Sequence, residues 1–564
     1  MKLTDKKYTR IDKAALTKEF NELLESFSNS ENPEKEIEIL HKINALRNTF
    51  SNTANLASIR HSINTKDAFY NDEKDFYDEF YPEYQSLEFR LNKLLLKTKN
   101  RISLEEKFGK HLFDIAETSV KCFSDKIIPL LQEENRLSTQ YDKLLSGAEI
   151  EFQGKTLNLS QMTPYEMDKD RKVRKAASEA KYKFFEKNKK ELDTFYDKLV
   201  KTRHKIALDL GFKNFTEVGY LRMGRTDYGP KEVAAFRKEV LDKVVPLSKW
   251  LKDKQRKRLE LDKLYFYDES IHFLSGNPKP KGDPEWILKQ ADKMYQELST
   301  ETSEFFNFMV ENDLMDVLTK DGKSPGGYCN YLPDFKFPFI FANFNGTSGD
   351  IDVMTHEAGH AFQCYESRHF DIPEYYFPTA EAAEIHSMSM EYFTWPYMDL
   401  FFEDEVLKYK FLHLEQSFNF LPYGVAVDEF QHLVYENPDA TPEERNQFWK
   451  QMEEKYLPGR NYDNIPFLEN GGFWQKQKHI YQVPFYYIDY TLAGVCALQF
   501  WVKDSKNHEK AWADYLDLCK RGGSLPFLKL VETAGLKSPF KEGSLAEVSE
   551  KAEKWLESVN DSEL

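Results

Sequence analysis

The pentapeptide His356-Glu357-Ala358-Gly359-His360 restricts the local structure of this chain more than any other feature. Histidines at positions i and i+4 can reach one ion only where the segment is an α-helix, because there they lie about one turn apart on the same face. Glu357 lies about 100° around that helix from His356, which keeps its carboxylate beside the ion. Apolar residues flank the motif, so the helix is predicted to be packed inside the protein. The motif therefore predicts a buried helix that carries a metal site.

A catalytic zinc ion needs a third protein ligand and an open position for water. A second helix, rich in carboxylates, is predicted at 379–393 and can pack antiparallel to the first because prolines mark a turn between them. Its candidate residues are Glu381, Glu384, His386 and Glu391. Glu384 and Glu391 share a face, so one can ligate while the other orients a ligand imidazole. Spacing alone leaves Glu381 and Glu384 open as the ligand, and His386 is equally well a hydrogen-bonded core residue.

Asp352 lies one turn before His356. It can accept a hydrogen bond from a ligand imidazole, as carboxylates behind metal ligands commonly do. It can equally be an acidic residue that favours the positive end of the helix dipole. Both interpretations stay open from the sequence.

An aromatic segment near the C-terminus contains His479, Tyr486 and Tyr490. The two tyrosines are at i and i+4, so on a helix both phenols point the same way. Such hydroxyls can stabilise an oxyanion, although an aromatic stripe at this spacing is also typical of a core. The metal motif favours the functional interpretation.

Most of the remaining sequence has helical periodicity. Apolar residues recur at three- and four-residue spacing among lysines and glutamates, which predicts helices over 10–50, 68–98, 104–146, 165–208 and 230–262. Strand signals are few, with one hairpin at 149–159 and a second β region at 326–345. Pro338 cannot donate a hydrogen bond to a sheet, so its strand is predicted to be an edge strand or to begin there. The pattern predicts a mainly α fold with a small β element.

The bulk composition excludes several classes of partner. The 564 residues predict two or three structural units, and 44 Phe with 31 Tyr can build a large core. A net charge of −16 argues against a nucleic-acid partner, which would require a basic face. No stretch is long and apolar enough to span a bilayer, the N-terminus lacks the core of a secretory signal, and the five cysteines are scattered. We expect a cytoplasmic protein that binds neither nucleic acid nor membrane.

The two helical motifs resemble a known family. His356–His360, followed by Ala383–Glu391, is similar to the thimet-type oligopeptidases of family M3, specifically their bacterial oligoendopeptidase F branch. The resemblance extends to Asp170–Ala177, Gly326–Cys329 and Phe337–Phe344. It implies that Glu384 is the third zinc ligand and that Glu391 supports the site.

The resemblance also implies that His479 and the C-terminal tyrosines Tyr486 and Tyr490 lie over the metal. Tyr487 stays an alternative, because the spacing of the tyrosines from the histidine varies in the family. The implied fold is a zincin-like helical ellipsoid with a deep substrate channel and a small β element beside the zinc helix. An edge strand near Ala342 would bind substrate backbone by strand addition. We expect a helical N-terminal region, 1–200, that covers the channel, and a catalytic domain, 201–564.

The predicted function is that of a zinc metalloendopeptidase that hydrolyses internal bonds of short unstructured oligopeptides. One Zn²⁺ per chain, on His356, His360 and Glu384, would activate a water whose proton Glu357 accepts. His479, Tyr486 and Tyr490 would hold the negative charge that develops on the carbonyl oxygen. Cleavage preference, substrate length limit and oligomeric state stay open.

Two alternatives compete with this prediction. A di-iron carboxylate oxidase in a helical bundle uses repeated Glu-x-x-His pairs, and the chain contains three of them. They are Glu357-x-x-His360, Glu429-x-x-His432 and Glu38-x-x-His41. This interpretation leaves His356 without a role. A catalytically silent peptide-binding relative is the other alternative, although ligands, base and oxyanion donors are all present.

Overall fold

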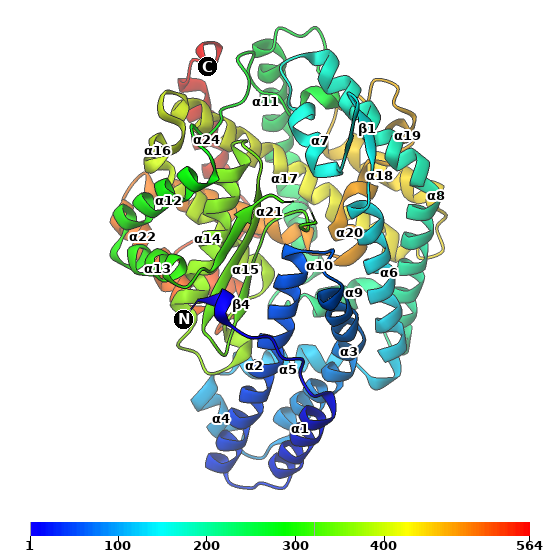
Figure 1. The fold of residues 1–564 in the computed structure, drawn as a ribbon, viewed down its shortest axis with the longest axis vertical. Helices are drawn as coiled ribbons and strands as arrows, with labels where there is room; N and C mark the ends of the chain where they lie inside the picture. Colours follow the sequence, from blue (N-terminus) through cyan, green and yellow to red (C-terminus); the bar gives the residue numbers. More distant parts are fainter. Residues whose placement is uncertain (1, 321) are drawn as a thin grey trace.

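The protein is described by a computed structural model that covers residues 2–320 and 322–564. Figure 1 shows an elongated, mostly helical body with a small sheet on one side. This confirms the mainly α fold with a small β element. Across these described ranges, none of the helices combines the length and apolar character that crossing a membrane requires.

The N-terminal helices form a bundle at one end of the body (Figure 1). They are α1 (Lys13–Ser28), α2 (Pro33–Ile63), α3 (Ala68–Lys97), α4 (Arg101–Phe108) and α5 (His111–Lys121). The helix predicted over 10–50 is divided because Asn32 caps α2 and Pro33 opens it. The bundle buries its own hydrophobic cluster, which Tyr375 joins from far along the chain.

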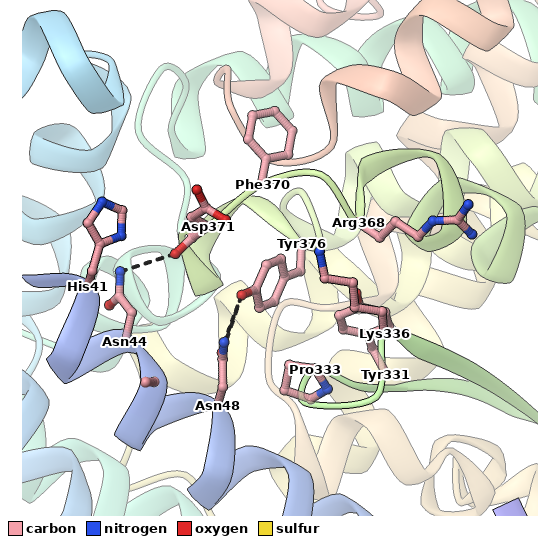
Figure 2. Close-up of a pocket in the computed structure, with 11 residues that line it drawn as sticks. His41, Asn44, Asn48, Tyr331, Pro333, Lys336, Arg368, Phe370, Asp371 and Tyr376 are labelled. Atoms are coloured by element: carbon pink, nitrogen blue, oxygen red, sulfur yellow. Dashed lines mark hydrogen bonds between the residues drawn. The ribbon is translucent and has the colours of Figure 1, made fainter. Parts of the chain in front are cut away.

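Figure 2 shows how α2 is joined to the rest of the molecule. The Asn44 amide donates to the carbonyl oxygen of Asp371 at 3.3 Å, and the Asn48 amide donates to the hydroxyl of Tyr376 at 3.0 Å. These side chains line a small pocket of about 190 Å³. The N-terminal bundle is thus hydrogen-bonded to the loop that precedes α15 (Ala380–Phe393).

The next part of the chain supplies the helices on the other side of the body. They are α6 (Ile128–Ser146), α7 (Leu159–Glu166), α8 (Arg171–Asp209), α9 (Phe215–Arg222), α10 (Pro230–Glu239) and α11 (Val245–Arg258). The predicted hairpin is confirmed as β1 (Ile150–Phe152) and β2 (Lys155–Leu157), paired antiparallel. Gln153 and Gly154 form its turn with φ of 49° and 74°.

Two more of the predicted long helices are interrupted. The helix over 104–146 is divided into α4, α5 and α6, because Gly109 follows α4 with φ 86°, a conformation that favours glycine and ends a helix. The helix over 230–262 contains a π-helical turn, η3 (Val240–Val244), directly before Pro246. Proline removes a backbone donor from the helical ladder, which accounts for the local widening.

The sheet lies beside the helix that carries the metal motif. Its strands are β3 (Met315–Leu318), β4 (Tyr328–Leu332) and β5 (Phe337–Phe344). Their order is β3-β5-β4, with β3 parallel and β4 antiparallel to β5. The prediction that the strand near Ala342 is an edge strand is therefore wrong, because β5 is central.

Pro338 is tolerated in this central strand because of where its ladders begin. It is the second residue of β5 and pairs with Tyr331 of β4, whereas pairing with β3 begins only at Met315 and Ile340. The missing N–H of Pro338 thus falls outside the β3 ladder. The strand begins one residue earlier, at Phe337, close to the second of the two alternatives that the sequence left open.

Helices α12 to α16 follow along the chain, with α14 and α15 toward the middle of the body (Figure 1). They are α12 (Pro284–Leu298), α13 (Thr300–Glu311), α14 (Gly349–Ser367), α15 and α16 (Asp399–Phe402). α14 and α15 cross at Gly359 of the metal motif. A Cβ there would lie 2.6 Å from Cα of Ser387 and 2.7 Å from the carbonyl oxygen of His386. Only glycine permits this approach, so the central residue of the motif also sets the distance between the two helices.

Gly359→Ala is expected to lower the free energy of unfolding by about 1–3 kcal/mol, the usual range for overpacking a core. The added methyl group meets backbone atoms of α15, which cannot rotate away. Differential scanning calorimetry measures the effect, with Gly494→Ala as a matched control. The Cβ at Gly494 would meet side-chain atoms alone, the flexible end of Met388 at 3.3 Å and Cδ2 of Leu421 at 3.7 Å. Equal melting temperatures for the two variants would contradict the role of Gly359.

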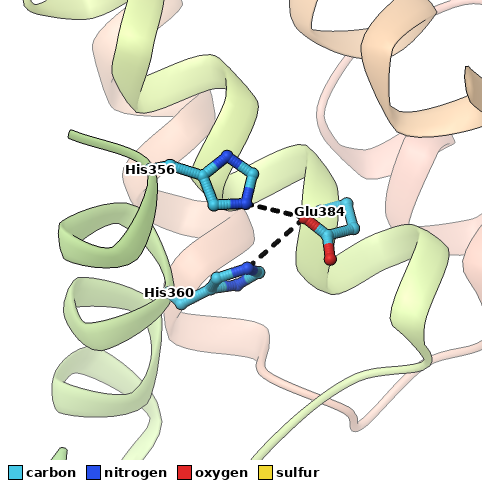
Figure 3. Close-up of side chains that lie close together, drawn as sticks. All are labelled: His356, His360 and Glu384. Carbon is cyan, nitrogen blue, oxygen red and sulfur yellow. Dashed lines mark ion pairs between the residues drawn. The ribbon is translucent and has the colours of Figure 1, made fainter. Parts of the chain in front are cut away.

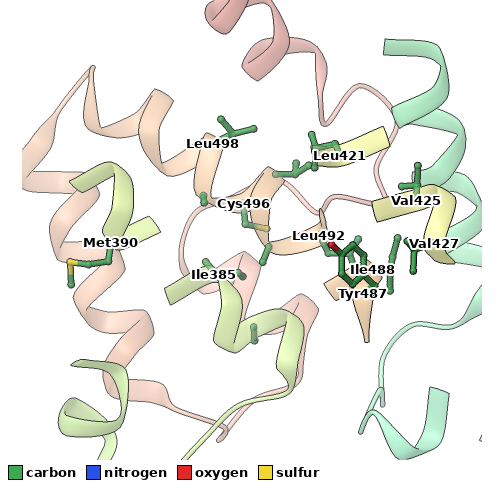
Figure 4. Close-up of a cluster of buried hydrophobic side chains, with 14 of the residues drawn as sticks. Ile385, Met390, Leu421, Val425, Val427, Tyr487, Ile488, Leu492, Cys496 and Leu498 are labelled. Atoms are coloured by element: carbon green, nitrogen blue, oxygen red, sulfur yellow. The ribbon is translucent and has the colours of Figure 1, made fainter. Parts of the chain in front are cut away.

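The C-terminal helices complete the core. They are α17 (Val406–Glu436), α18 (Pro442–Tyr456), α19 (Pro466–Glu469), α20 (Lys478–Gln482), α21 (Tyr487–Asp504), α22 (His508–Arg521), α23 (Phe527–Thr533) and α24 (Ala546–Ser558). Short 3-10 turns occur at Leu3–Asp5, Asp125–Ile127, Phe266–Asp268, Pro373–Tyr375, Trp395–Tyr397, Glu403–Glu405, Phe473–Lys476 (η8) and Asp561–Glu563. Figure 4 shows α15, α17 and α21 meeting through Ile385, Leu421 and Ile488, all buried. This packing fixes α21 against the helix that carries Glu384.

Candidate metal centre

α14 carries His356, Glu357 and His360, and its start is fixed by the turn from β5. The Asp350 carboxylate accepts hydrogen bonds from the backbone N–H groups of Asn345, at 2.8 Å, and Gly346, at 2.7 Å. These bonds tie the strand end to the first turn of the helix. The register of α14 relative to the sheet is thereby set.

Two imidazoles and one carboxylate converge between α14 and α15 (Figure 3). Nε2 of His356 lies 3.1 Å from Oε2 of Glu384, and Nε2 of His360 lies 3.4 Å from the same oxygen. The three ligand atoms all lie within 4.8 Å of one another. The structure thus brings together the three residues predicted as metal ligands.

The other candidates on α15 face elsewhere. Glu381 is fully buried, and Arg225 is the cation that acts on its carboxylate. His386 is also fully buried, and its ring lies 6.4 Å from that of Tyr515. The sequence spacing left either Glu381 or Glu384 as the third metal ligand. Of these two, only Glu384 projects toward the motif histidines.

Glu391 holds a ligand imidazole from behind, as predicted for its position. Its Oε1 lies 2.7 Å from Nδ1 of His356, and its Oε2 lies 2.7 Å from Nε2 of His413. The indole N–H of Trp395 donates to Nδ1 of His413 at 3.1 Å, so the proton of this second imidazole lies on Nε2 and points at Glu391. Because both oxygens of Glu391 are hydrogen-bonded, this carboxylate holds the His356 ring with its Nε2 directed at the candidate metal site.

Asp352 lies in the first turn of α14, which agrees with its second interpretation, that of an acidic residue near the positive end of the helix dipole. Its Oδ1 accepts a hydrogen bond from the hydroxyl of Tyr409 at 2.7 Å. The bond from the ligand imidazole goes to Glu391 instead. Burial raises the pKa of Asp352 to about 6, against the opposing effect of His413. Asp352 therefore belongs to a polar layer between α14 and α17.

Glu357 lies beside the three ligands with one oxygen free of protein partners. The residue is 7% exposed, and its Oε2 makes no hydrogen bond within the described part of the chain. A Cβ at Gly327 would lie 3.3 Å from Oε1 of Glu357, so this glycine leaves the space next to the carboxylate. Burial raises the pKa of Glu357, although His356 and His360 oppose the shift. A raised pKa suits a group that must accept a proton near neutral pH.

The electrostatics of the centre favour positive charge. Burial alone would lower the pKa of His356, but Glu384 and Glu391 outweigh it and raise that pKa well above its usual range. Burial would raise the pKa of Glu384, yet His360 and His356 hold it well below its usual range. A cation at this point would replace the imidazole proton as the partner of the carboxylates.

The C-terminal aromatic segment reaches the same centre. The Tyr486 hydroxyl donates to Oε1 of Glu384 at 2.7 Å, and its ring lies 5.1 Å from that of Tyr490. Tyr487 instead packs against Tyr423 and Phe420, so of the two neighbouring tyrosines Tyr486 faces the candidate ligands.

A chain of hydrogen bonds fixes the proton on His479. The Tyr423 hydroxyl donates to Oε1 of Gln477 at 3.0 Å, so the Gln477 amide nitrogen donates to Nδ1 of His479 at 2.8 Å. The proton of the neutral ring is then on Nε2, which lies 3.3 Å from the hydroxyl of Tyr490. Burial lowers the pKa of His479 to about 4, which keeps the ring neutral. The Tyr490 hydroxyl accepts this bond, so its own proton is directed to another acceptor, and Tyr486 is its neighbour.

The other Glu-x-x-His pairs do not join the centre. Glu429 pairs with Lys455 at 2.7 Å, and Nε2 of His432 contacts the hydroxyl of Tyr220 at 3.1 Å. Glu38 pairs with Lys42 on an exposed helical face. Within residues 2–320 and 322–564, the His356 group is the only set of three or more such ligands that converges. The arrangement does not supply the second ligand set of a di-iron site.

A cavity of about 1530 Å³ lies among α3, α6, α7 and the loop before β4. Asn343 and Asn345 line it at the end of β5, and Lys478 lines it next to His479. Both β5 and the segment at His479 lead to the metal centre. The cavity thus extends between the N-terminal helices and elements that flank the centre.

Comparison with known families gives two matches. The profile of peptidase family M3 matches residues 165–279 and 287–550, and that of the peptidase M3 N-terminal domain matches residues 3–123. Together they span most of the chain, including α14, α15 and α21.

Comparison with individual proteins identifies the same family. The chain is 52% identical to a solved structure of Pz peptidase A with an inhibitor, with a TM-score of 0.98 and 100% of each chain covered. It is 51% identical to a structure described as an oligoendopeptidase F of Bacillus anthracis strain Ames, with a TM-score of 0.93, covering 100% of this chain and 99% of that one. It is 25% identical over 382 residues to oligoendopeptidase F of Lactococcus lactis subsp. cremoris, covering 65% of this chain. That match spans 60% of the Lactococcus protein's length.

Proposed function

The chain belongs to peptidase family M3, in its oligoendopeptidase F branch, and from this we propose that it is a zinc-dependent endopeptidase acting on unstructured oligopeptides. The observation that carries the proposal is the convergence of His356, His360 and Glu384 with the free carboxylate oxygen of Glu357 beside them. Both parts of a hydrolytic centre, a cation site and a base, lie at one end of one helix pair.

The residues at this centre fit a catalytic zinc ion. Two imidazoles and one carboxylate are a known ligand set for catalytic zinc, which keeps a further position open. Glu357 also keeps one buried oxygen without a protein partner, which suits a base beside such an ion. A bound zinc ion would polarise the scissile carbonyl and lower the pKa of the attacking water.

The protein's own groups would handle the protons and the developing charge. Glu357 accepts the proton of the attacking water and delivers it to the leaving amine. The Tyr490 hydroxyl, whose oxygen accepts from His479, donates its own proton to the carbonyl oxygen as that oxygen becomes negative. Tyr486 would serve as a second donor if its hydroxyl proton turned from the Glu384 carboxylate to the carbonyl oxygen. Glu391 keeps His356 in its ligating tautomer.

The cavity supports unstructured peptides as substrates. Its volume of about 1530 Å³ suits an extended chain of a few residues, not a folded domain. With β5 in the centre of the sheet, the strand that we propose pairs with substrate backbone is β4, an edge strand that packs on α14. We further propose that residues 1–200 cover the channel and 201–564 form the catalytic domain. The covering role is supported by α3 and α6, which line the cavity. The proposed boundary at residue 200 lies within α8, which runs unbroken across it.

Metal content and peptide cleavage test the proposal together. We expect about one zinc ion per chain, cleavage of an internally quenched peptide, loss of cleavage with a chelator, and recovery on adding zinc. Two irons per chain without cleavage would support the oxidase alternative instead. Bound zinc and bound peptide without cleavage would identify a silent relative.

A further inference from the structure

The cavity wall is basic although the protein is acidic. Lysines outnumber acidic side chains along it, and no glutamate among the described residues lines it. Its lysines are Lys66, Lys74, Lys143, Lys181, Lys320, Lys323, Lys476 and Lys478, and its acidic residues are Asp75, Asp78 and Asp142. The whole chain has a net charge of −16, so positive charge is concentrated where a substrate would lie.

Several of these lysines already have a carboxylate partner. Nζ of Lys181 lies 2.8 Å from Glu166, and Nζ of Lys478 lies 2.7 Å from Asp142. Lys476 differs, because its ammonium has no ion pair or hydrogen bond with any described residue. The cavity therefore contains a half-buried ammonium without a counter-charge.

The carboxylates near Lys476, Glu166 and Glu269, are each paired with another cation. Its Nζ lies 3.9 Å from the centre of the Phe473 ring, and the guanidinium of Arg460 lies 4.7 Å from the same ring. Arg460 is itself paired with Glu269 at 2.6 Å. Burial, with the nearby cations Lys181 and Arg460, lowers the pKa of Lys476 to about 7. An anion that enters the cavity would offset the free-energy cost of keeping this half-buried ammonium charged.

Lys476 lies on the same short chain segment as His479, a residue of the candidate metal centre. It is the last residue of η8, and the next residue, Gln477, bonds to His479. A ligand group held at Lys476 is therefore positioned by the same short stretch of chain that positions an oxyanion-side imidazole.

We propose that Lys476 binds a carboxylate of the peptide substrate. The carboxylate is either the free C-terminus or an aspartate or glutamate side chain, since an ammonium recognises both alike. The inference rests on the peptide binding proposed above and adds a preference for anionic peptides. It predicts a subsite that selects for charge within a channel that otherwise selects for extended conformation.

Matched peptides test the subsite. One quenched peptide is prepared with a free or amidated C-terminus, and with glutamate or glutamine at successive internal positions. For the unmodified enzyme, neutralising the recognised carboxylate should lower kcat/KM by about 10-fold, the usual size of a charge-assisted hydrogen bond. Lys476→Met should lose the same factor on the charged peptide and cleave both versions equally. Lys478→Met is the control, because that ammonium is already paired with Asp142, and it should retain the discrimination.

Binding to Glu357→Gln protein, measured by fluorescence anisotropy, separates this inference from the proposed activity. A tenfold preference for the charged peptide that disappears on adding Lys476→Met supports the subsite even if no peptide is cleaved. Sensitivity to amidation alone identifies the C-terminus as the ligand, and sensitivity to glutamine identifies a side chain. Equal cleavage and equal binding of all versions would overturn the subsite and leave the peptidase intact.

Discussion

Glu357→Gln is expected to keep its metal and to lose turnover by about 10²–10⁴-fold, the usual contribution of a general base. Glutamine preserves the size of the side chain but cannot accept a proton. Glu357 does not share the ligand group formed by His356, His360 and Glu384, so cation binding should be unchanged. Metal content by mass spectrometry and kcat/KM on a quenched peptide measure the two effects separately.

Glu381→Gln is the matched control for this substitution. Glu381 lies fully buried on the neighbouring helix and outside the ligand group, and glutamine preserves the size of its side chain. Its activity should stay within a factor of a few of the unmodified enzyme. If Glu357→Gln hydrolysed peptide at the unmodified rate, another group would have to be the base.

The two candidate histidine ligands could be predicted because local geometry brings them together. His356 and His360 are on one face of any helix that contains them, and the apolar flanks require that helix to be buried. The choice between Glu381 and Glu384 depends on how α15 is rotated about its axis. The contact at Gly359 fixes that rotation, because it places α14 against the backbone of His386 and Ser387. Sequence spacing contains no information about this contact.

Residues that act from other elements could not be predicted. His413 and Tyr409 come from α17, and no spacing rule connects them to Glu391 or Asp352. The same is true of Gln477 and its hydrogen bond to His479. Only for Glu391 was a signal available. A carboxylate that orients a metal ligand is commonly hydrogen-bonded to a second partner, so a residue such as His413 could have been expected there.

The error about β5 has a similar cause. Proline in a strand indicates an edge, but the rule applies to each ladder separately. The β3 ladder begins only at Ile340, beyond Pro338, and β3 comes from a segment without a strand signal in its residues. The number of partners of a strand is a property of the whole sheet. A local pattern could therefore place the β element beside α14 but not the order of its strands.

Glu384→Gln is expected to abolish metal retention, and with it nearly all activity. The substitution removes the one anionic ligand, whose Oε2 lies 3.1 Å and 3.4 Å from the two imidazole nitrogens. An amide oxygen is a weaker zinc ligand than a carboxylate, and an amide N–H group would oppose the cation. Zinc content after dialysis should fall from about one per chain to nearly none. Added zinc should raise the melting temperature of the unmodified protein but not that of the variant, because only a bound ligand stabilises the folded state.

Tyr486→Phe provides the contrast that assigns this effect to the carboxylate. It removes the 2.7 Å hydrogen bond to Oε1 of Glu384 while leaving the carboxylate in place. This variant should retain zinc and its stabilising effect, and it should lose activity only through the missing hydroxyl donor. If Glu384→Gln kept stoichiometric zinc, a different carboxylate would have to complete the site. If Tyr486→Phe also lost zinc, the tyrosine would be holding the ligand in place, and its proposed contact with the substrate would be secondary.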